Sequence, residues 1–436
     1  MLQALLSGIA SIKAQQTRMN VIGNNLANVN TTAYKSSSVT FQTIIDQTIQ
    51  GASKPTASLG GTNPIQFGLG VTVGGTNVDN VQGSLNATNR PTDLAIQGNG
   101  YFMVSNGASI SYTRDGSFGL DANGDLVQRS TGQRVLGWSA DATGNIDTTI
   151  PVGAGSALNV PLGRLNAVQG TTKMSLAGNL NANSLPTDSW TTQVRVYDSI
   201  GGAHDLTVVF NNRSTPPTPP ALPVGATAPA GAVSSWDWQA FEGTVATGTP
   251  IGDSTTAGNT PLYFNASGAQ VGGNVDTITI PGGVAGTLPF NITMDCSTIG
   301  QLNTTTQVST SDQNGFPPGS LQGFSIGNDG TLTGTFTNGL TRTLGTISMS
   351  NFPNPDGMQS LGSNLWGSTD NSGLPVVGTA GTGGRGNVNS GFLEQSNVDI
   401  GSQFTDLIVT QRGFQANTKV VTTVDDMLQN LIDMKR

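Results

Sequence analysis

Residues 1–35 read MLQALLSGIASIKAQQTRMNVIGNNLANVNTTAYK, and this stretch decides how the rest of the chain is arranged. Apolar side chains recur along it in alternating steps of three and four, the spacing of a coiled-coil seam. We call this row the apolar seam; its members are Leu2, Leu5, Ile9, Ile12, Met19 and Leu26. Only Gln16 and Gly23 interrupt it. The spacing predicts a long helix whose narrow seam needs a partner helix.

A second helical pattern runs from Phe404 towards the end of the sequence, with a wider apolar stripe. We expect the two terminal segments to pack against each other. Two interpretations stay open: a coiled coil that closes one subunit, or a surface through which subunits polymerise. The narrowness of the apolar seam favours polymerisation. The apolar residues of the second pattern are Phe404, Leu407, Ile408, Phe414, Val420, Val421, Val424, Met427, Leu428, Leu431 and Ile432.

The composition excludes several classes of function. Only 10% of the 436 residues are charged, against roughly 25% in ordinary soluble domains. The net charge of -8 and the lack of a Lys/Arg cluster argue against binding to nucleic acid or to an anionic membrane. The sequence contains no run of eighteen apolar residues, so we expect no transmembrane span. The N-terminal segment lacks the features of a cleavable secretion signal, so we expect any export to use an uncleaved terminus.

Candidate sites for chemistry are few. His204 is the only histidine and stands beside Asp205; neighbours in a strand point to opposite faces, so we expect a strand-edge histidine and not a catalytic pair. Cys296 is the only cysteine, and no role is assigned to it. We interpret Asp121–Asp125 as a hairpin turn in preference to a calcium loop, and Gly68–Gly74 as a connector in preference to a phosphate loop. No metal, cofactor or catalytic residue is predicted.

The middle of the chain has the period of two that is typical of strands. Asn123-Gly124 and Asn338-Gly339 each lie between apolar runs and predict hairpins, because type I′ turns need positive φ. Two further runs, Trp190–Tyr197 and Leu206–Phe210, predict a strand pair. Residues 36–70 are polar and rich in turn formers, and we expect an extended connector there with one helical turn near Phe41.

These elements predict a multidomain, mainly β chain with terminal α-helices and a nested arrangement, in which each inner segment is inserted into the domain outside it. The N- and C-terminal helices form an axial coiled-coil core and carry two β-rich domains inserted outward. The predicted parts are an axial core of residues 1–35 and 391–436, the connector 36–70, an inner β domain of 71–146 and 321–390, and an outer β domain of 147–320.

Several stretches together resemble one family, the flagellar rod, hook and hook-associated axial proteins. Val196–Gly201, Asn351–Gly357 and Leu361–Leu365 resemble the hook members more than the shorter distal rod protein, which is the alternative. Ala33 stands where the family usually has glycine, which leaves open whether the backbone there takes positive φ. The stretches that carry the resemblance to the family are Ser7–Lys35, Asn89–Phe102, Tyr112–Phe118, Gly391–Asp399 and Gln411–Asn417.

The resemblance implies a non-enzymatic structural protein that assembles with copies of itself into a hollow, curved tube, the flexible universal joint between flagellar motor and filament. It implies an extracellular location, export without a cleaved signal peptide through the flagellar export apparatus, a rod protein as proximal partner, and hook–filament junction proteins and a hook cap as distal partners. The expected subunit contacts are Leu2, Leu5, Ile9, Ile12, Met19, Asn24, Asn25, Leu26, Asn28, Tyr34, Phe404, Leu407, Gln411, Arg412, Phe414, Asn417, Val421, Leu428 and Leu431.

A competing class is a secreted β-rich protein that binds or hydrolyses cell-wall glycan. Such a protein needs a cleft with convergent carboxylates or aromatic side chains. Trp236 and Trp238 are the one pair in the sequence that suggests it.

Overall fold

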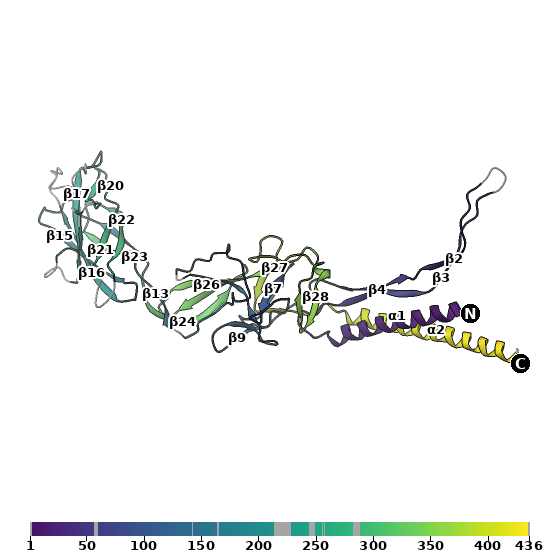
Figure 1. Ribbon diagram of the computed structural model, residues 1–436. Coiled ribbons are helices and arrows are strands. Elements are labelled where there is room, and N and C mark those ends of the chain that lie inside the picture. The colour runs from purple at the N-terminus through teal and green to yellow at the C-terminus, as the bar shows by residue number, and fades with distance from the viewer. Residues whose placement is uncertain are drawn as a thin grey trace. The chain divides into compact units, whose positions relative to one another are not determined.

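The computed structural model describes residues 2–55, 60–141, 143–163, 165–212, 228–243, 249–254, 256, 258–281 and 288–434 (Figure 1). The chain divides into two compact units. Unit 1 holds Met1–Val160, Ser325–Thr333 and Thr343–Arg436, and unit 2 holds Pro161–Phe324 and Gly334–Arg342. The expected fold class, mainly β with a helix at each end, is confirmed.

Unit 1 contains both helices, and its residues come from both ends of the chain. Its elements are α1 (Leu2–Ala27), β1 (Ser37–Thr43), β2 (Asp46–Gln50), β3 (Ile65–Gly68), β4 (Val71–Val78), β5 (Leu85–Ala87), β6 (Leu94–Gln97), β7 (Tyr101–Ser105), β8 (Ile110–Thr113), β9 (Phe118–Leu120), β10 (Leu126–Gln128), β11 (Arg134–Val135), β12 (Gly137–Ser139), β27 (Met349–Asn351), η1 (Pro355–Gly357), β28 (Gln359–Gly362), β29 (Leu365–Gly367), β30 (Val376–Gly378), β31 (Asn387–Ser390), β32 (Phe392–Glu394) and α2 (Ile400–Asp433).

Unit 2 is built from strands in its described part. They are β13 (Leu165–Gln169), β14 (Lys173–Asn179), β15 (Ser189–Tyr197), β16 (Ala203–Asn212), β17 (Ser234–Glu242), β18 (Gly252–Asp253), β19 (Leu262–Phe264), β20 (Gln270–Gly272), β21 (Val275–Ile280), β22 (Phe290–Gly300) and β23 (Gln307–Gln313). Three strands have residues in both units: β24 (Phe316–Ile326), β25 (Thr331–Phe336) and β26 (Thr341–Ile347).

The largest sheet of unit 1 has the order β28-β29-β8-β7-β11-β10-β9, and β27 pairs with both β7 and β30. Its strands carry fully buried apolar side chains, and Phe102 meets Phe118 edge to face at 5.2 Å. The expected hairpin at Asn123-Gly124 is confirmed: β9 pairs with β10, and Gly124 has φ +88°. The Asp121 carboxylate accepts hydrogen bonds from the backbone of Asn123 and Asp125, so it caps the turn.

The segment after α1 differs from the expected connector with a helical turn. β1 pairs with β4 in antiparallel register, and β2 pairs with β3, so these four strands form two-stranded ribbons. A β-bulge falls between Thr40 and Phe41, the place where the helical turn was expected. Alternating Ser, Val and Thr side chains favour the ribbon because β-branched residues fit a pleated strand better than a short helix.

In unit 2, two sheets share one apolar core. One has the order β15-β16-β17-β19-β20, with β18 on β17, and the other has the order β21-β22-β14-β23. The expected pairing of Trp190–Tyr197 with Leu206–Phe210 is confirmed by β15 and β16. Trp236 and Trp238 are 1% and 0% exposed within this core, where they fill volume between the sheets. They therefore cannot serve as a platform for a sugar.

A buried carboxyl group lies beside Trp238. Asp276 is 2% exposed and accepts hydrogen bonds from the indole Nε1 of Trp238 at 2.9 Å and the backbone N of Thr260 at 2.9 Å. Burial raises the pKa of Asp276 to about 6, and the two hydrogen bonds oppose that rise. The folded state therefore holds this proton to higher pH than the unfolded state does.

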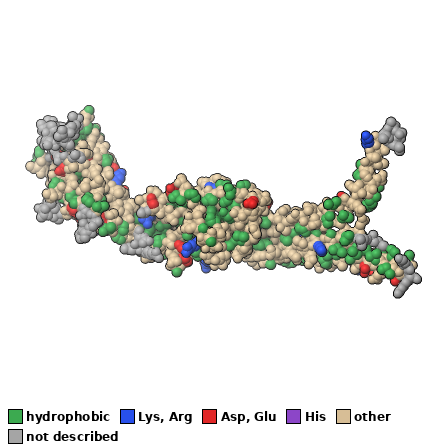
Figure 2. Space-filling model, viewed as in Figure 1, with side chains coloured by type: hydrophobic (Ala, Val, Ile, Leu, Met, Phe, Trp, Pro, Cys, Tyr) green, Lys and Arg blue, Asp and Glu red, His purple; other side chains and the backbone are tan. Residues whose placement is uncertain are grey.

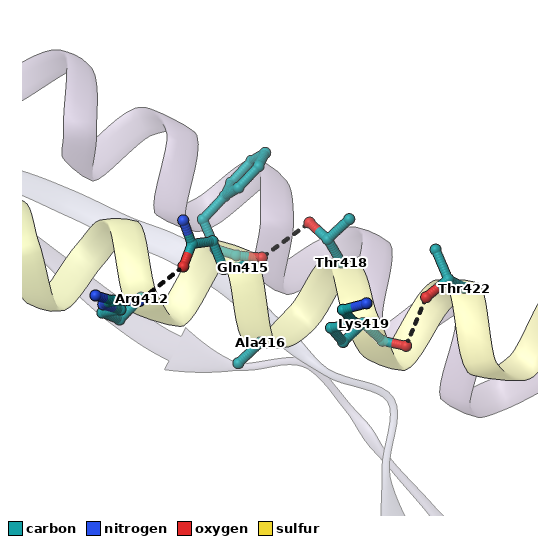
Figure 3. Close-up of a pocket in the computed structure, with 7 residues that line it drawn as sticks. Arg412, Gln415, Ala416, Thr418, Lys419 and Thr422 are labelled. Carbon is teal, nitrogen blue, oxygen red and sulfur yellow. Dashed lines mark hydrogen bonds between the residues drawn. The ribbon is translucent and has the colours of Figure 1, made fainter.

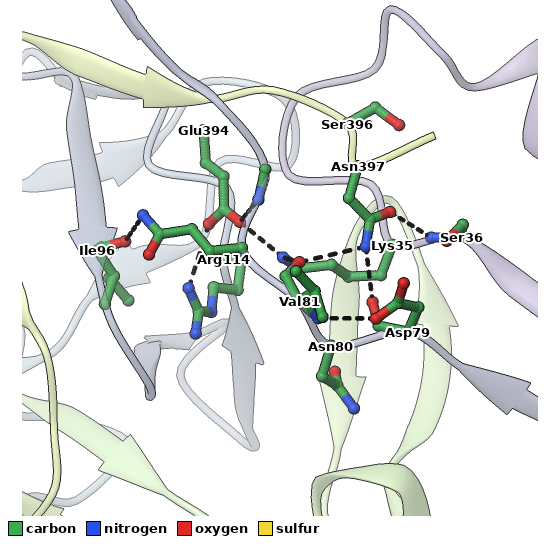
Figure 4. A network of polar contacts seen from close by, with 12 residues as sticks. Lys35, Ser36, Asp79, Asn80, Val81, Ile96, Arg114, Glu394, Ser396 and Asn397 are labelled. Atoms are coloured by element: carbon green, nitrogen blue, oxygen red, sulfur yellow. Dashed lines mark hydrogen bonds and ion pairs between the residues drawn. The ribbon is translucent and has the colours of Figure 1, made fainter. Parts of the chain in front are cut away.

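A second buried carboxylate joins the two ends of the chain in unit 1 (Figure 4). Glu394 accepts hydrogen bonds from Lys35 Nζ at 2.6 Å, Gly83 N at 2.9 Å and Arg114 Nη1 at 3.2 Å. Its side chain is fully buried, as that of Lys35 nearly is. Burial lowers the pKa of Lys35, and the charge of Glu394 opposes that shift. We call these four residues the Glu394 cluster.

Neighbouring contacts extend the Glu394 cluster. The side chain of Asn397 accepts from Ser36 N at 2.8 Å and donates to the carbonyl of Asp79 at 2.9 Å. Ala33 N donates to the carbonyl of Glu394 at 2.9 Å, and Ala33 has φ +56°. The backbone of Ala33 thus takes the left-handed conformation, which the glycine usual at this position in the family would adopt more easily than alanine does. These contacts hold the segment that follows α1 against the segment that precedes α2.

The Asp276→Asn variant should remove a pH dependence from the stability of unit 2. In the wild-type chain the folded pKa of about 6 lies above the unfolded value near 4, so unfolding releases a proton and the free energy of unfolding falls as pH rises from about 4 to about 6. We expect this difference to reach on the order of 2 kcal/mol. Tryptophan fluorescence during urea unfolding at pH 4 to 7.5 measures it. A gap between wild type and variant that is constant with pH would contradict this assignment.

The Glu394→Gln variant should destabilise unit 1, because it leaves the cations of Lys35 and Arg114 buried without a countercharge. Breaking a buried ion pair from one side costs about 3–5 kcal/mol. Urea unfolding, with hydrogen exchange to locate the loss, measures the effect. The control is Asp205→Asn, which breaks an exposed pair with Arg195 and should leave stability unchanged. Equal stability of the Glu394→Gln and Asp205→Asn variants would show that the charge of Glu394 is dispensable.

Candidate subunit interface on the terminal helices

The helices α1 and α2 lie side by side and run antiparallel (Figure 1). Asn417 Nδ2 donates to Ser11 Oγ at 2.7 Å, and Arg18 Nη2 pairs with Asp406 Oδ1 at 2.9 Å. At one end of the pair, Gly8 permits close approach, since a Cβ there would lie 3.0 Å from Cγ2 of Val421.

The row of α1 that faces α2 is mostly polar. Gly8, Ser11, Gln15, Arg18 and Asn25 contact α2, and the buried Ile22 falls in the same row by its spacing, again in steps of three and four. At 100° per residue, the apolar seam is centred roughly 110° round the helix from this row. The two terminal helices therefore pack together as expected, but through this row of α1 and not through the apolar seam. Glycine and hydrogen-bonding side chains make the closer and better satisfied contact within one chain.

A third face of α1 packs on the ribbon of β1 and β4. A Cβ at Gly70, which has φ +120°, would lie 3.1 Å from Cα of Ser7 and 3.4 Å from Cβ of Ala10. Ala14 belongs to the same face and is buried. The apolar seam is thus turned away from both α2 and the ribbon.

The exposure of the predicted contact residues follows from this geometry. Ile9 is 38%, Phe404 48% and Leu431 52% exposed. The side chain of Leu2 lies outside the described residues. Half-buried are Leu5, Ile12, Met19, Leu26, Asn28, Tyr34, Leu407, Phe414, Asn417, Val421 and Leu428, whereas Asn24, Gln411 and Arg412 are exposed.

Two of the predicted contact residues form hydrogen bonds from one terminal helix to the other. Asn25 is 1% exposed; its amide donates to Gln403 Oε1 and to the carbonyl of Ser37, and its oxygen accepts from Tyr34 OH at 3.1 Å. Asn417 binds Ser11. These polar residues hold the helix pair together.

Other apolar residues of the same helices are exposed although they were not among the predicted contacts. Leu6 and Val409 lie outside both predicted apolar rows. Ile408, Val420, Met427 and Ile432 belong to the second helical pattern but were left out of the predicted contacts. Figure 2 shows hydrophobic side chains along the visible face of this region, with few charged ones among them.

A shallow hollow lies on the exposed face of α2 (Figure 3). Within it, Arg412 Nη1 donates to Gln415 Oε1 at 3.4 Å. The lining offers two cations, an aromatic ring and hydroxyl groups but no nucleophile paired with a base, so it suits a contact surface better than a reaction. The lining residues are Arg412, Phe414, Gln415, Ala416, Thr418, Lys419 and Thr422.

The other candidate sites do not converge on a chemical function. His204 lies between two carboxylates, with Nδ1 2.6 Å from Glu242 Oε1 and Nε2 3.5 Å from Asp198 Oδ2, while Asp205 pairs with Arg195. His204 and Asp205 thus diverge, as predicted. Burial raises the pKa of the Cys296 thiol, which makes it a poor nucleophile. Within the described ranges, no group of three or more His, Cys, Asp or Glu side chains is placed to hold a metal ion.

Among the described helices, none is long and apolar enough to cross a membrane.

Family comparisons cover both ends and the middle of the chain. Residues 5–35 match the family described as "Flagella basal body rod protein", and residues 389–434 match "Flagellar basal body rod FlgEFG protein C-terminal". Residues 95–169 match "Flagellar hook protein FlgE/F/G D1 domain", and residues 165–316 match "Flagellar basal body protein FlaE D2 domain".

Full-length relatives agree with these matches. The flagellar hook protein FlgE of Borreliella burgdorferi is 35% identical, with 100% of each chain covered. That of Escherichia coli K12 is 33% identical over 99% of this chain and 100% of the relative. A flagellar basal-body rod protein, FlgG of Bacillus subtilis, is 28% identical with 100% of each covered, so length alone does not separate rod from hook. Identity at this level over the whole length establishes that the chain belongs to the flagellar hook protein family.

Proposed function

We propose that copies of this chain polymerise into the flagellar hook, a hollow, curved helical tube that acts as a flexible universal joint between rod and filament. The observation that carries the proposal is the direction of the apolar seam, which faces away from α2 and from the ribbon of β1 and β4. Neighbouring copies would cover it, with the terminal helices as the inner wall of the tube.

The energetics favour assembly through this surface. Ile9, Phe404 and Ile408 are each more than a third exposed on the terminal helices, and exposed apolar surface of this kind commonly marks an interface. Burying one such side chain contributes roughly 1.5–3 kcal/mol at full burial. A contact between unlike surfaces, repeated without closing, produces a filament. Polymerisation thus removes from water the apolar area that one chain leaves exposed.

The remaining features of the proposal follow from the family. The chain acts as a structural protein and not as an enzyme, and it is located at the hook outside the cell after export without a cleaved signal peptide. Its partners are a rod protein, hook–filament junction proteins, the hook cap and the export apparatus. In this proposal residues 1–35 and 391–436 form the axial core, residues 71–146 with 321–390 form an inner β domain, and residues 147–320 form an outer β domain.

The outer domain suits a joint that bends. Its surface is rich in Thr, Asn and Gly and poor in charge. Contacts between such surfaces are commonly bridged by water and can be remade at small cost as subunits slide. We infer that these contacts change while the inner wall stays packed.

The cell-wall alternative loses its main support, because Trp236 and Trp238 are buried. Binding of the purified chain to peptidoglycan, or turnover of peptidoglycan by it, would restore that alternative.

A Leu5→Ser/Ile9→Ser variant should assemble poorly. Electron microscopy of the purified chain after salting-out should show tubes for the wild type, and pelleting should give its critical concentration. We expect this concentration to rise at least about tenfold in the variant, since each lost apolar contact is worth on the order of 1 kcal/mol.

The matched control is Leu374→Ser, because Leu374 is 86% exposed and lies outside the helices. It should assemble like the wild type. Tubes that form equally well from the Leu5→Ser/Ile9→Ser variant would refute the role of the apolar seam, and wild-type chains that stay monomeric would refute the proposed function.

A further inference from the structure

A second apolar row runs along α2, beside the residues that meet α1. Its positions from Val409 to Met427 alternate steps of four and three residues, the spacing that the apolar seam of α1 also has. Gly413 and Thr423 stand at two of these positions, as Gln16 and Gly23 do in the apolar seam. We call this row the α2 row; its apolar members are Val409, Ala416, Val420, Met427 and Leu431.

The α2 row is exposed along its whole length. Val409, Val420, Met427 and Leu431 are between 45% and 57% exposed, and Ala416 is exposed as well. At 1.5 Å per residue the α2 row is about 33 Å long, and the apolar seam is about 36 Å long. One helix pair therefore leaves at its surface two apolar rows of the same spacing and nearly the same length.

The two rows lie on opposite sides of the helix pair. The helices run antiparallel, so along one viewing direction successive residues turn clockwise in one helix and anticlockwise in the other (Figure 1). Counted with rising residue number, the apolar seam is centred roughly 110° after the row of α1 that faces α2, whereas the α2 row is centred roughly 90° before the residues of α2 that face α1. Both rows are thus reached by turning the same way from the contact, which places them on opposite sides of the plane through the two helix axes.

We propose that the α2 row of one copy receives the apolar seam of a neighbouring copy, with side chains interlocked as in a coiled coil. This inference rests on the proposed polymerisation and names the surface that covers the apolar seam. The two surfaces are unlike, so each added copy covers one row and presents the other, and the contact repeats without closing. Contact between two identical rows does not meet this condition, because copies related by a screw operation present different faces to one another.

Photo-crosslinking tests which surfaces meet. A photoreactive benzophenone amino acid replaces Val420, and tubes are assembled from an equimolar mixture of this variant with isotope-labelled wild-type chains. The mass difference separates crosslinks between copies from crosslinks within one copy. We expect the main crosslink between copies to join position 420 of one chain to an α1 peptide of another that carries residues of the apolar seam.

The matched control places the same amino acid at Thr422. This residue is also exposed on α2 but lies roughly 160° round the helix from Val420. It should give no crosslink to α1 of another copy. Crosslinks from position 420 that reach α2 or the β region of another copy instead of α1 would overturn the inference.

A mutant cycle gives a second measurement that needs no bulky probe. The Val420→Ser/Met427→Ser variant should raise the critical concentration for tubes about tenfold, as Leu5→Ser/Ile9→Ser should. The variant with all four substitutions should raise it well below the product of the two effects, about a hundredfold, because both pairs remove the same contact. Multiplicative effects, or normal assembly of Val420→Ser/Met427→Ser, would assign the rows to separate contacts and refute their pairing. If the wild-type chain forms no tubes at all, the proposed function fails and this inference fails with it.

Discussion

The buried carboxylate of Glu394 is the interaction on which the arrangement of unit 1 depends. It joins Lys35, which follows α1, to the strand that precedes α2, and it adds Gly83 and Arg114 of the β region. Replacing such a buried ion pair with apolar groups is often no less stable, so its value lies in defining one arrangement. Because both helices are tied at the same end, they leave the β region side by side.

The contact between the helices then has an unusual composition for a helix pair. Small and hydrogen-bonding residues face the partner, with Gly8 against Val421 and Ser11 against Asn417. Such a contact fixes direction and separation, while helices of this length draw most of their stability from apolar packing. The apolar seam is left half-buried or exposed in one chain, so neighbouring copies that cover it would stabilise the pair further.

Local signals predicted much of the fold. Asn123-Gly124 identified its hairpin because the turn needs positive φ at Gly124, and the alternating apolar residues of β15 and β16 predicted their pairing. Periodicity also predicted both helices. It could not tell which row of α1 meets α2, because the polar row beginning at Gly8 has the same spacing as the apolar seam. Nor could it find the pair of Lys35 with Glu394, which are 359 residues apart with no local pattern to link them.

The apolar seam by itself cannot fix where a neighbouring copy sits. Apolar contact is proportional to buried area and does not depend on direction, so the apolar seam favours any neighbour that covers it, including one shifted by a turn. Directional contacts such as hydrogen bonds and ion pairs do depend on position, because a small shift breaks them. The affinity between copies and their position along the axis therefore require different kinds of contact.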